Sequence, residues 1–180
     1  QCLPTWNQDV GNQGPNATVF ALASYDDGSG PALYAGGYFT AAGTSTTRGI
    51  ARWNGITWSG VNGIGTNISG LSSMLVFDDG NGPALYVGGF FHSMDGVAAS
   101  CIARWNGTSW SALGAGIVGT VYAMTSIIED GVPTLYVGGN LISAGGNPAA
   151  YVARWKNNAW STLGSGMNDQ VYAVTTFDDG

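Results

Sequence analysis

The acidic residues of this sequence are concentrated at one position of a repeating pattern. Eight of the eleven acidic residues lie in the turns that we expect after the first strand of each repeat. They are Asp26, Asp27, Asp78, Asp79, Glu129, Asp130, Asp178 and Asp179. Hard cations prefer carboxylate and carbonyl oxygens, so one interpretation is a ring of weak Ca²⁺ sites with ligands from Asp26, Asp27, Asp78, Asp79, Glu129 and Asp130. The other is that Asp-Asp-Gly favours a tight turn through side-chain hydrogen bonds and keeps a weakly charged surface soluble. We favour the second interpretation, so calcium is the single cofactor left open.

A second group of chemically diverse side chains is formed by His92, Met94 and Asp95. One histidine beside one aspartate, without a matching nucleophile, forms neither a catalytic triad nor a metal-ligand set. We therefore predict a surface loop here, with ligand contact as the alternative. No catalytic residue is predicted anywhere in the chain.

Two cysteines and three sequons bear on the compartment. A disulfide between Cys2 and Cys101 would favour an oxidising compartment, and the alternative is two separate small apolar side chains. Asn16, Asn67 and Asn106 begin Asn-X-Ser/Thr sequons, which permit glycosylation in a secreting eukaryote. Chance matches are common in so Asn- and Thr-rich a chain, and Asn106 is also explained by a turn.

The composition excludes some classes of partner. Charged residues make up 9% of the 180-residue chain, against roughly 25% in ordinary soluble proteins, and there are 30 glycines. The net charge of −6 and a total of five Lys and Arg argue against nucleic acid, because phosphate binding needs clustered basic residues. No apolar run approaches the roughly 18 residues of a membrane span. We expect an extracellular or cell-surface protein with no membrane insertion.

The chain repeats itself three times. Leu33-Tyr34-Ala35-Gly36-Gly37 recurs as LYVGG 52 residues later and again after 50 more, each copy followed by a hydrophobic residue, Ala-Arg-Trp and a second Trp. The residues that define the repeat are Gly36, Gly37, Trp53, Trp58, Gly88, Gly89, Trp105, Trp110, Gly138, Gly139, Trp155 and Trp160. A period near 50 is typical of propellers and solenoids, in which each unit packs against its neighbours.

Each repeat predicts four strands and no helix. In the first repeat the strands are Val19–Tyr25, Ala32–Phe39, Ile50–Trp53 and a fourth that follows the Asn54-Gly55 turn. Asn-Gly is a strong signal for a two-residue type I′ hairpin. The corresponding turns of the other repeats are expected at Asn106-Gly107 and Asn157-Asn158.

The expected turn sets which side chains share a face. It places Trp53 opposite Ile56, so that Trp53 and Trp58 become diagonal neighbours on one face and pack together. Three copies of the Trp pair suit a structural role. Arg52 lies on the opposite face, and we expect it and its equivalents to reach carbonyls or acids of a neighbouring repeat.

These motifs resemble kelch-type β-propeller repeats, in which a strand ending in Gly-Gly is followed by an aromatic residue and a Trp. The fuller form, LYVGG with ARWNG and a later Trp, is more similar to repeats of large secreted surface proteins of bacteria and to fungal cortical markers. A second resemblance is to chromatin-regulator propellers of similar repeat length. The resemblance implies blades of about 50 residues and no catalytic motif, because such families share architecture rather than chemistry.

We expect an all-β fold, one propeller repeat region over residues 1–180, of about three and a half four-stranded antiparallel blades. Its parts are a leading fourth-strand segment at 1–16, blades at 17–62, 63–115 and 116–166, and the first strand of a further blade at 167–180. A propeller generally needs four or more blades. The chain is then part of a longer protein, half of a paired seven-bladed ring, or a unit that forms filaments through open strand edges.

Three functions follow from these expectations. The first is a non-enzymatic extracellular or cell-surface protein with a structural, adhesive or assembly role, whose partners are proteins or further copies of itself. The second is a propeller lectin that binds glycans through the variable loops at 40–48, 91–100 and 141–150, together with those around 62–70 and 114–120. The third is the propeller scaffold of an enzyme whose catalytic part lies outside this chain.

Overall fold

A computed structural model describes residues 14–61 and 70–177. Our predictions for the leading segment up to residue 13, and those for Cys2, Asn67, Asp178 and Asp179, lie outside the described residues. Every regular element in the described part is a strand, which confirms the all-β prediction.

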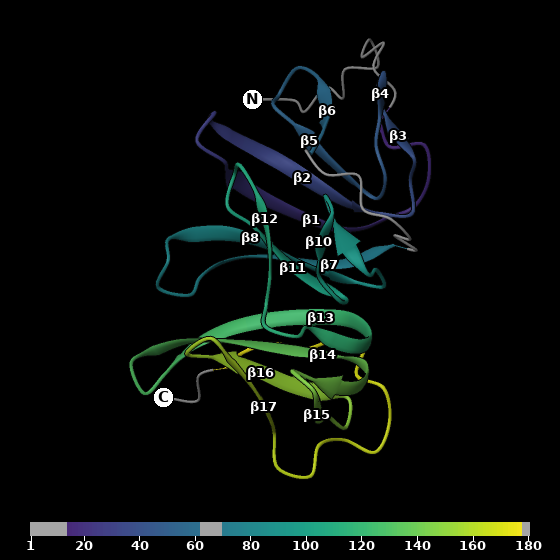
Figure 1. Ribbon diagram of the computed structural model, residues 1–180. Coiled ribbons are helices and arrows are strands. Elements are labelled where there is room, and N and C mark those ends of the chain that lie inside the picture. Colours follow the sequence, from purple (N-terminus) through teal and green to yellow (C-terminus); the bar gives the residue numbers. More distant parts are fainter. Residues whose placement is uncertain (1–13, 62–69, 178–180) are drawn as a thin grey trace, which may run out of the picture.

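Each repeat forms one four-stranded antiparallel sheet whose strand order follows the chain (Figure 1). The first sheet, blade 1, contains β1 (Val19–Asp26), β2 (Pro31–Gly37), β5 (Ile50–Trp53) and β6 (Trp58–Gly60). Blade 2 contains β7 (Leu71–Asp78), β8 (Pro83–Gly89), β11 (Ile102–Trp105) and β12 (Trp110–Ala112). Blade 3 contains β13 (Ile117–Glu129), β14 (Val132–Ala144), β16 (Val152–Lys156) and β17 (Ala159–Thr162). The predicted four-stranded blades are confirmed.

The loops after the second strands carry short hairpins of their own. These involve β3 (Ala41–Ala42) with β4 (Ser45–Thr46), β9 (Ser93–Met94) with β10 (Val97–Ala98), and β15 (Asn147–Pro148) with the end of β14. They lie at the opposite end of the sheets from the acidic turns (Figure 1). The expected variable loops are therefore partly ordered by strand pairing.

Each blade has two unlike faces, and unlike faces meet between blades. The Trp face carries the Trp pair and a leucine, represented in blade 2 by Leu85, Trp105 and Trp110. The Tyr face carries a tyrosine and an isoleucine or valine, represented in blade 1 by Tyr34 and Ile50. These five residues belong to one hydrophobic cluster, so the Trp face of blade 2 covers the Tyr face of blade 1. The Trp face of blade 3 covers the Tyr face of blade 2 in the same way.

In blades 1 and 2 the outer hairpin differs from our prediction by one residue of register, whereas the turn of blade 3 lies at Asn157-Asn158 as predicted. The backbone N–H of Asn54 donates to the carbonyl of Thr57 at 3.3 Å, so the turn is centred on Gly55-Ile56 rather than on Asn54-Gly55. Trp53 consequently lies directly opposite Trp58. The Asn54 side chain caps the turn, because its Oδ1 accepts hydrogen bonds from the N–H groups of Ile56 and Thr57. That side-chain capping makes Asn favourable one position before the turn.

The predicted packing of the Trp pairs on one face is nevertheless correct. The ring centroids are 5.4 Å apart for Trp53 and Trp58, 5.2 Å apart in blade 2 and 5.2 Å apart in blade 3. Directly opposite side chains in an antiparallel pair share a face, as diagonal ones do. The pair therefore packs as expected despite the shifted turn.

The two glycines of each Gly-Gly motif have different structural causes. The first strand of every blade contains a β-bulge opposite the motif, at Phe20, Ser72 and Tyr122. A Cβ on the second glycine, such as Gly89, would lie 2.2 Å from the carbonyl oxygen of Gly70 in the bulged strand. A Cβ on the first glycine, Gly88, would instead lie 2.5 Å from the Val121 side chain of the next blade. One glycine permits the bulge and the other permits the blades to approach.

We predicted the first strand of a further blade at Val171–Phe177, and these residues are in no ladder of the described chain. They still lie where the first strand of a next blade would lie. The side chains of Val171 and Val174 approach Gly138 just as those of Val121 and Met124 approach Gly88. The N–H of Val171 also donates to the carbonyl of Gly139 at 3.2 Å. A strand needs a ladder partner, which β1, β7 and β13 find in the strand that follows each of them.

Candidate functional site

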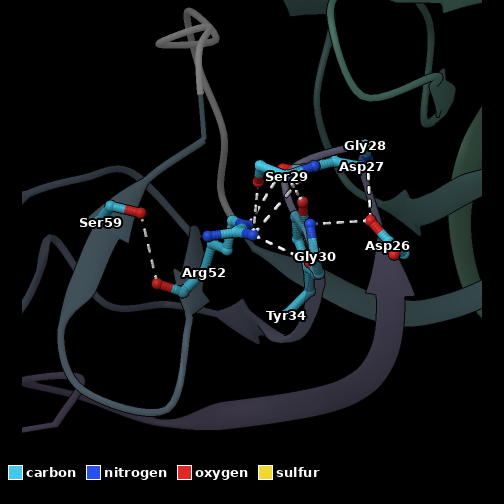
Figure 2. A network of polar contacts seen from close by, with 8 residues as sticks. All are labelled: Asp26, Asp27, Gly28, Ser29, Gly30, Tyr34, Arg52 and Ser59. Atoms are coloured by element: carbon cyan, nitrogen blue, oxygen red, sulfur yellow. Dashed lines mark hydrogen bonds and ion pairs between the residues drawn. The ribbon is translucent and has the colours of Figure 1, made fainter.

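The acidic turn of blade 1 is one hydrogen-bonded network (Figure 2). The Tyr34 hydroxyl donates to Asp27 Oδ2 at 2.7 Å, and Arg52 Nε pairs with the same oxygen at 3.0 Å. The other Asp27 oxygen accepts the backbone N–H of Ser29 at 3.0 Å. Arg52 continues to the carbonyl of Gly30 at 3.1 Å. The turn, the second strand and the third strand are thereby tied together at the edge of the Tyr face.

The preceding aspartate shapes the turn itself. Asp26 Oδ1 accepts hydrogen bonds from the N–H groups of Gly28 and Gly30, at 2.9 and 3.0 Å. Asp78 makes the same pair of bonds to Gly80 and Gly82 in blade 2, at 2.8 and 3.0 Å. These are the side-chain hydrogen bonds that our favoured interpretation of Asp-Asp-Gly requires.

The network recurs in blade 2 with looser geometry. Arg104 Nε lies 4.0 Å from Asp79 Oδ1, and Arg104 donates to the carbonyl of Gly82 at 3.2 Å. Burial by itself would raise the pKa of Asp79, but its surroundings, with Tyr86, Asn81 and Arg104, outweigh burial and lower it. Unlike Tyr34, the buried Tyr86 hydroxyl forms no hydrogen bond within the described residues. The arrangement of acid, tyrosine and arginine is therefore a property of the repeat.

In blade 3 a glutamate takes the place of the second aspartate. Glu129 accepts hydrogen bonds from Arg154 at 2.6 Å, Lys156 at 3.0 Å and the Tyr136 hydroxyl at 3.1 Å. Asp130 is turned to solvent, with a side chain that is 90% exposed, and meets Lys156 at 3.3 Å.

The arginines thus stay within their own blades, contrary to our expectation that they reach a neighbouring repeat. Arg52 stands directly opposite Tyr34 on the adjacent strand, so its guanidinium reaches only as far as its own hairpin turn. Sequence spacing cannot distinguish the two destinations, because each repeat supplies an equivalent acidic turn.

The pKa values follow from these contacts. Burial by itself would raise the pKa of Asp27, but hydrogen bonds from Ser29 and Tyr34 and the charge of Arg52 outweigh burial and lower it. The pKa of Glu129 is lowered first by its hydrogen bond from Lys156, with Tyr136 and Arg154 adding to the effect. Carboxylates that are held ionised in this way are suited to a structural role rather than to general acid catalysis.

Calcium at these turns stays the alternative interpretation. The second acid of each turn already accepts protein donors. The described residues contain no cluster of three or more His, Cys, Asp or Glu side chains placed to hold a metal ion. A cation would therefore have to compete with arginine and tyrosine for the same oxygens.

We expect the protein to lose stability in acid. The pKa values of Asp27, Asp79 and Glu129 are lower when folded than the roughly 3.9 to 4.3 of unfolded chains. Their contribution is therefore fully present above about pH 4 and is lost as the pH falls through the lowered values. Urea unfolding followed by far-UV circular dichroism should give a lower midpoint at pH 3 than at pH 6. The combined variant Asp27→Asn, Asp79→Asn and Glu129→Gln should flatten this difference, and an unchanged midpoint in the native chain would contradict the assignment.

The structure does not bring His92, Met94 and Asp95 together at one surface site. Met94 is fully buried in the hydrophobic cluster between blades 1 and 2, while His92 and Asp95 are exposed. His92 packs its ring on Phe90 at 5.6 Å, and Asp95 begins a tight turn with φ 49°. Only the two exposed residues remain available to a ligand.

Cys101 is a buried free thiol whose Sγ contacts the carbonyl of Gly119 at 2.9 Å, and burial raises the pKa of this thiol.

Asn16 is exposed, and its side-chain amide holds the loop at Thr40 by donating to Oγ1 at 3.1 Å. Asn106 is exposed in the outer turn of blade 2, where its Oδ1 accepts the N–H of Ser109 at 2.8 Å. Glycosylation of Asn16 and Asn106 stays a prediction.

Reasoning from the sequence missed a cluster of aromatic side chains. Phe20, Tyr38, Phe90, Tyr122 and Tyr172 line a cavity of about 270 Å³ beside the bulges of the first strands. Phe20, Tyr122 and Tyr172 occupy the same position of successive repeats, with Ser72 at that position in the second repeat. This recurrence was the available signal, but single aromatic residues at strand starts resemble ordinary core residues.

No known protein family, curated protein or solved structure matches this chain. Repeated four-stranded antiparallel sheets arranged as blades are what the structure establishes. Within the described residues no helix is long and apolar enough to cross a membrane.

Proposed function

We propose that this is a non-enzymatic, kelch-like propeller protein of the extracellular space or cell surface with a structural, adhesive or assembly role. We further propose that copies of the chain associate through the faces at the two ends of the array. The low charge content and the repeat resemblance support the compartment and the class. The observation that carries the proposal concerns the two ends of the array. One end exposes a Trp face and the other a Tyr face, and these two kinds of face pack together between blades 1 and 2 and between blades 2 and 3.

The first half is the Trp face of blade 1, which no described blade covers. Leu33 is 36% exposed, whereas its equivalent Leu85 is 0% exposed. Leu22 is 59% exposed, whereas its equivalent Met124 is 9% exposed. The same side-chain positions are thus open at the end of the array and closed inside it.

The second half is the Tyr face of blade 3. The tyrosine of this face is fully buried in blades 1 and 2, but Tyr136 is partly exposed. Residues Ile127, Tyr136 and Val152 line a cavity of about 480 Å³ together with the chain that follows β17. The equivalent residues of blade 1, Tyr34 and Ile50, pack against the Trp face of blade 2.

A second copy of the chain is therefore a chemically matched occupant for each end. Contact between unlike faces is heterologous, so it either closes into a ring or continues as a filament. The segment around Val171 occupies the place of the first strand of a next blade, because Val171 and Val174 pack against Gly138. The β1 strand of a second copy would take this same place, so association requires the segment to be displaced.

Light scattering of the 180-residue chain over a range of concentrations tests the proposal. We expect a concentration-dependent mass of at least twice the 18.5 kDa of one chain. The double variant Leu22→Asp and Leu33→Asp should return the mass to that of one chain, because it places charges in the end face. Ile128→Asp is the control, since Ile128 is 68% exposed and, as the neighbour of Ile127 on β13, points to the opposite side of the strand from the open Tyr face. A monodisperse single chain at every concentration would refute association through the end faces.

A further inference from the structure

We infer that the aromatic cavity, formed by Phe20, Tyr38, Ser72, Phe90, Tyr122 and Tyr172, is a binding site for a neutral saccharide. This inference does not depend on the proposed assembly. It rests on how the cavity is built, on the exposure of its rings and on the absence of charge in its lining.

All three blades and the segment after blade 3 contribute to this cavity. The first strands of the blades are neighbours, with β7 packed between β1 and β13. Each carries a bulge at its cavity residue, so that Phe20, Ser72 and Tyr122 are the extra residues of their strands. Bulges re-aim side chains and are frequent next to binding sites. Here they direct one side chain per repeat to a common place.

The aromatic rings of the cavity are exposed rather than used by the core. Phe20 is 50% exposed, Tyr38 59%, Phe90 42% and Tyr172 72%. Among the large aromatic side chains that are exposed in the described chain, only Phe177 lies outside this cavity. Large exposed aromatic groups that gather in one hollow commonly mark a ligand site.

The rings are also held in place. A Cβ on Gly70 would lie 2.0 Å from the Tyr38 ring, so this glycine lets the ring rest against the backbone. Phe20 packs edge-to-face on Tyr38 with centroids 4.8 Å apart. Tyr122 and Tyr172 stack at 5.2 Å with an interplanar angle of 3°. Rings that are already ordered reduce the entropy that a ligand loses on binding.

The chemistry of the lining favours a sugar. The residues that line the cavity include serine, threonine and tyrosine hydroxyls, and no charged side chain is among those described there. Aromatic faces carry partial negative charge and attract the polarised C–H groups of a sugar ring. The hydroxyls of Ser72, Tyr122 and Tyr172 donate to protein oxygens, so their own oxygens are left to accept hydrogen bonds from sugar hydroxyls. A quaternary ammonium ion would also bind ring faces, but it makes no use of hydroxyl groups. A volume of about 270 Å³ suits one or two sugar rings.

Titration calorimetry with defined probes tests this site. The probes are glucose, galactose, mannose, N-acetylglucosamine, cellobiose and lactose, with choline chloride as the cationic comparison. We expect saturable binding of at least one neutral sugar, weakened at least tenfold by Tyr38→Ala and by Tyr172→Ala. Phe177→Ala is the matched control, because Phe177 is 89% exposed and lies outside the cavity, and it should leave the affinity unchanged.

Both cavity variants remove exposed side chains, so circular dichroism should confirm that they fold. Three results would each overturn the assignment. They are the absence of saturable sugar binding, equal sugar affinity in both variants and the native chain, and binding of choline alone. The mass measured by light scattering should be the same for Tyr172→Ala and the native chain, which separates this result from the test of assembly.

Discussion

Replacement of Trp105 by alanine is expected to lower the free energy of unfolding by about 3 to 5 kcal/mol, the usual cost of removing a buried tryptophan. Trp105 is 3% exposed between blades 1 and 2 and packs on Trp110. The same substitution at Trp53 is expected to cost about 2 kcal/mol or less, because less apolar surface is removed from water there. Trp53 makes the equivalent contact with Trp58 but lies on the open Trp face of blade 1.

The two variants control for each other, since they change the same residue type at the same position of the repeat. Urea unfolding followed by far-UV circular dichroism measures both, at a protein concentration where light scattering gives the mass of one chain. Equal losses in the two variants would show that the Trp face of blade 1 is covered in the single chain. If the loss of unfolding free energy in the Trp53 variant grew with protein concentration, this would instead support association through that face.

The Gly89→Ala variant is expected to destabilise the protein by about 3 kcal/mol, at the upper end of the range for overpacking. The added Cβ would lie 2.2 Å from the carbonyl oxygen of Gly70 and 3.0 Å from the Cα of Leu71. Both are backbone atoms of the adjacent strand, so relief requires the strands to separate at the bulge. Gly37 and Gly139 have the same close approach, at 2.0 and 2.1 Å.

Two further glycines calibrate this result. Gly88→Ala should cost less than Gly89→Ala, because the nearest atom to its Cβ is the side-chain methyl Val121 Cγ1, at 2.5 Å, rather than a backbone atom. Gly14→Ala has no heavy atom within 4 Å of its Cβ and should change stability by no more than about 0.5 kcal/mol. Thermal unfolding of the three variants measures the order directly. A Gly89→Ala variant as stable as Gly14→Ala would contradict the structural cause that we assign to the Gly-Gly motif.

Part of the candidate site could be predicted from the sequence because it is local. The hydrogen bonds of Asp26 and Asp78 join residues two and four positions apart, and the sequence Asp-Asp-Gly specifies them without help from the rest of the fold. The partner of Arg52 is 25 residues away across two strands, so its destination depends on which strands pair. The aromatic cavity depends on contacts between repeats, which no spacing within one repeat reveals.

By itself, the sequence determined the all-β class, the three blades, the extent of strands such as Ile50–Trp53 and the face that each Trp pair shares. These features follow from strand propensity, turn residues and the two-residue period of a strand. The tertiary structure decided the bulges at Phe20, Ser72 and Tyr122 and the unpaired state of the chain beyond Val171. Each of these depends on hydrogen bonds or packing with residues far away in the chain, and such contacts are fixed only when the blades have stacked.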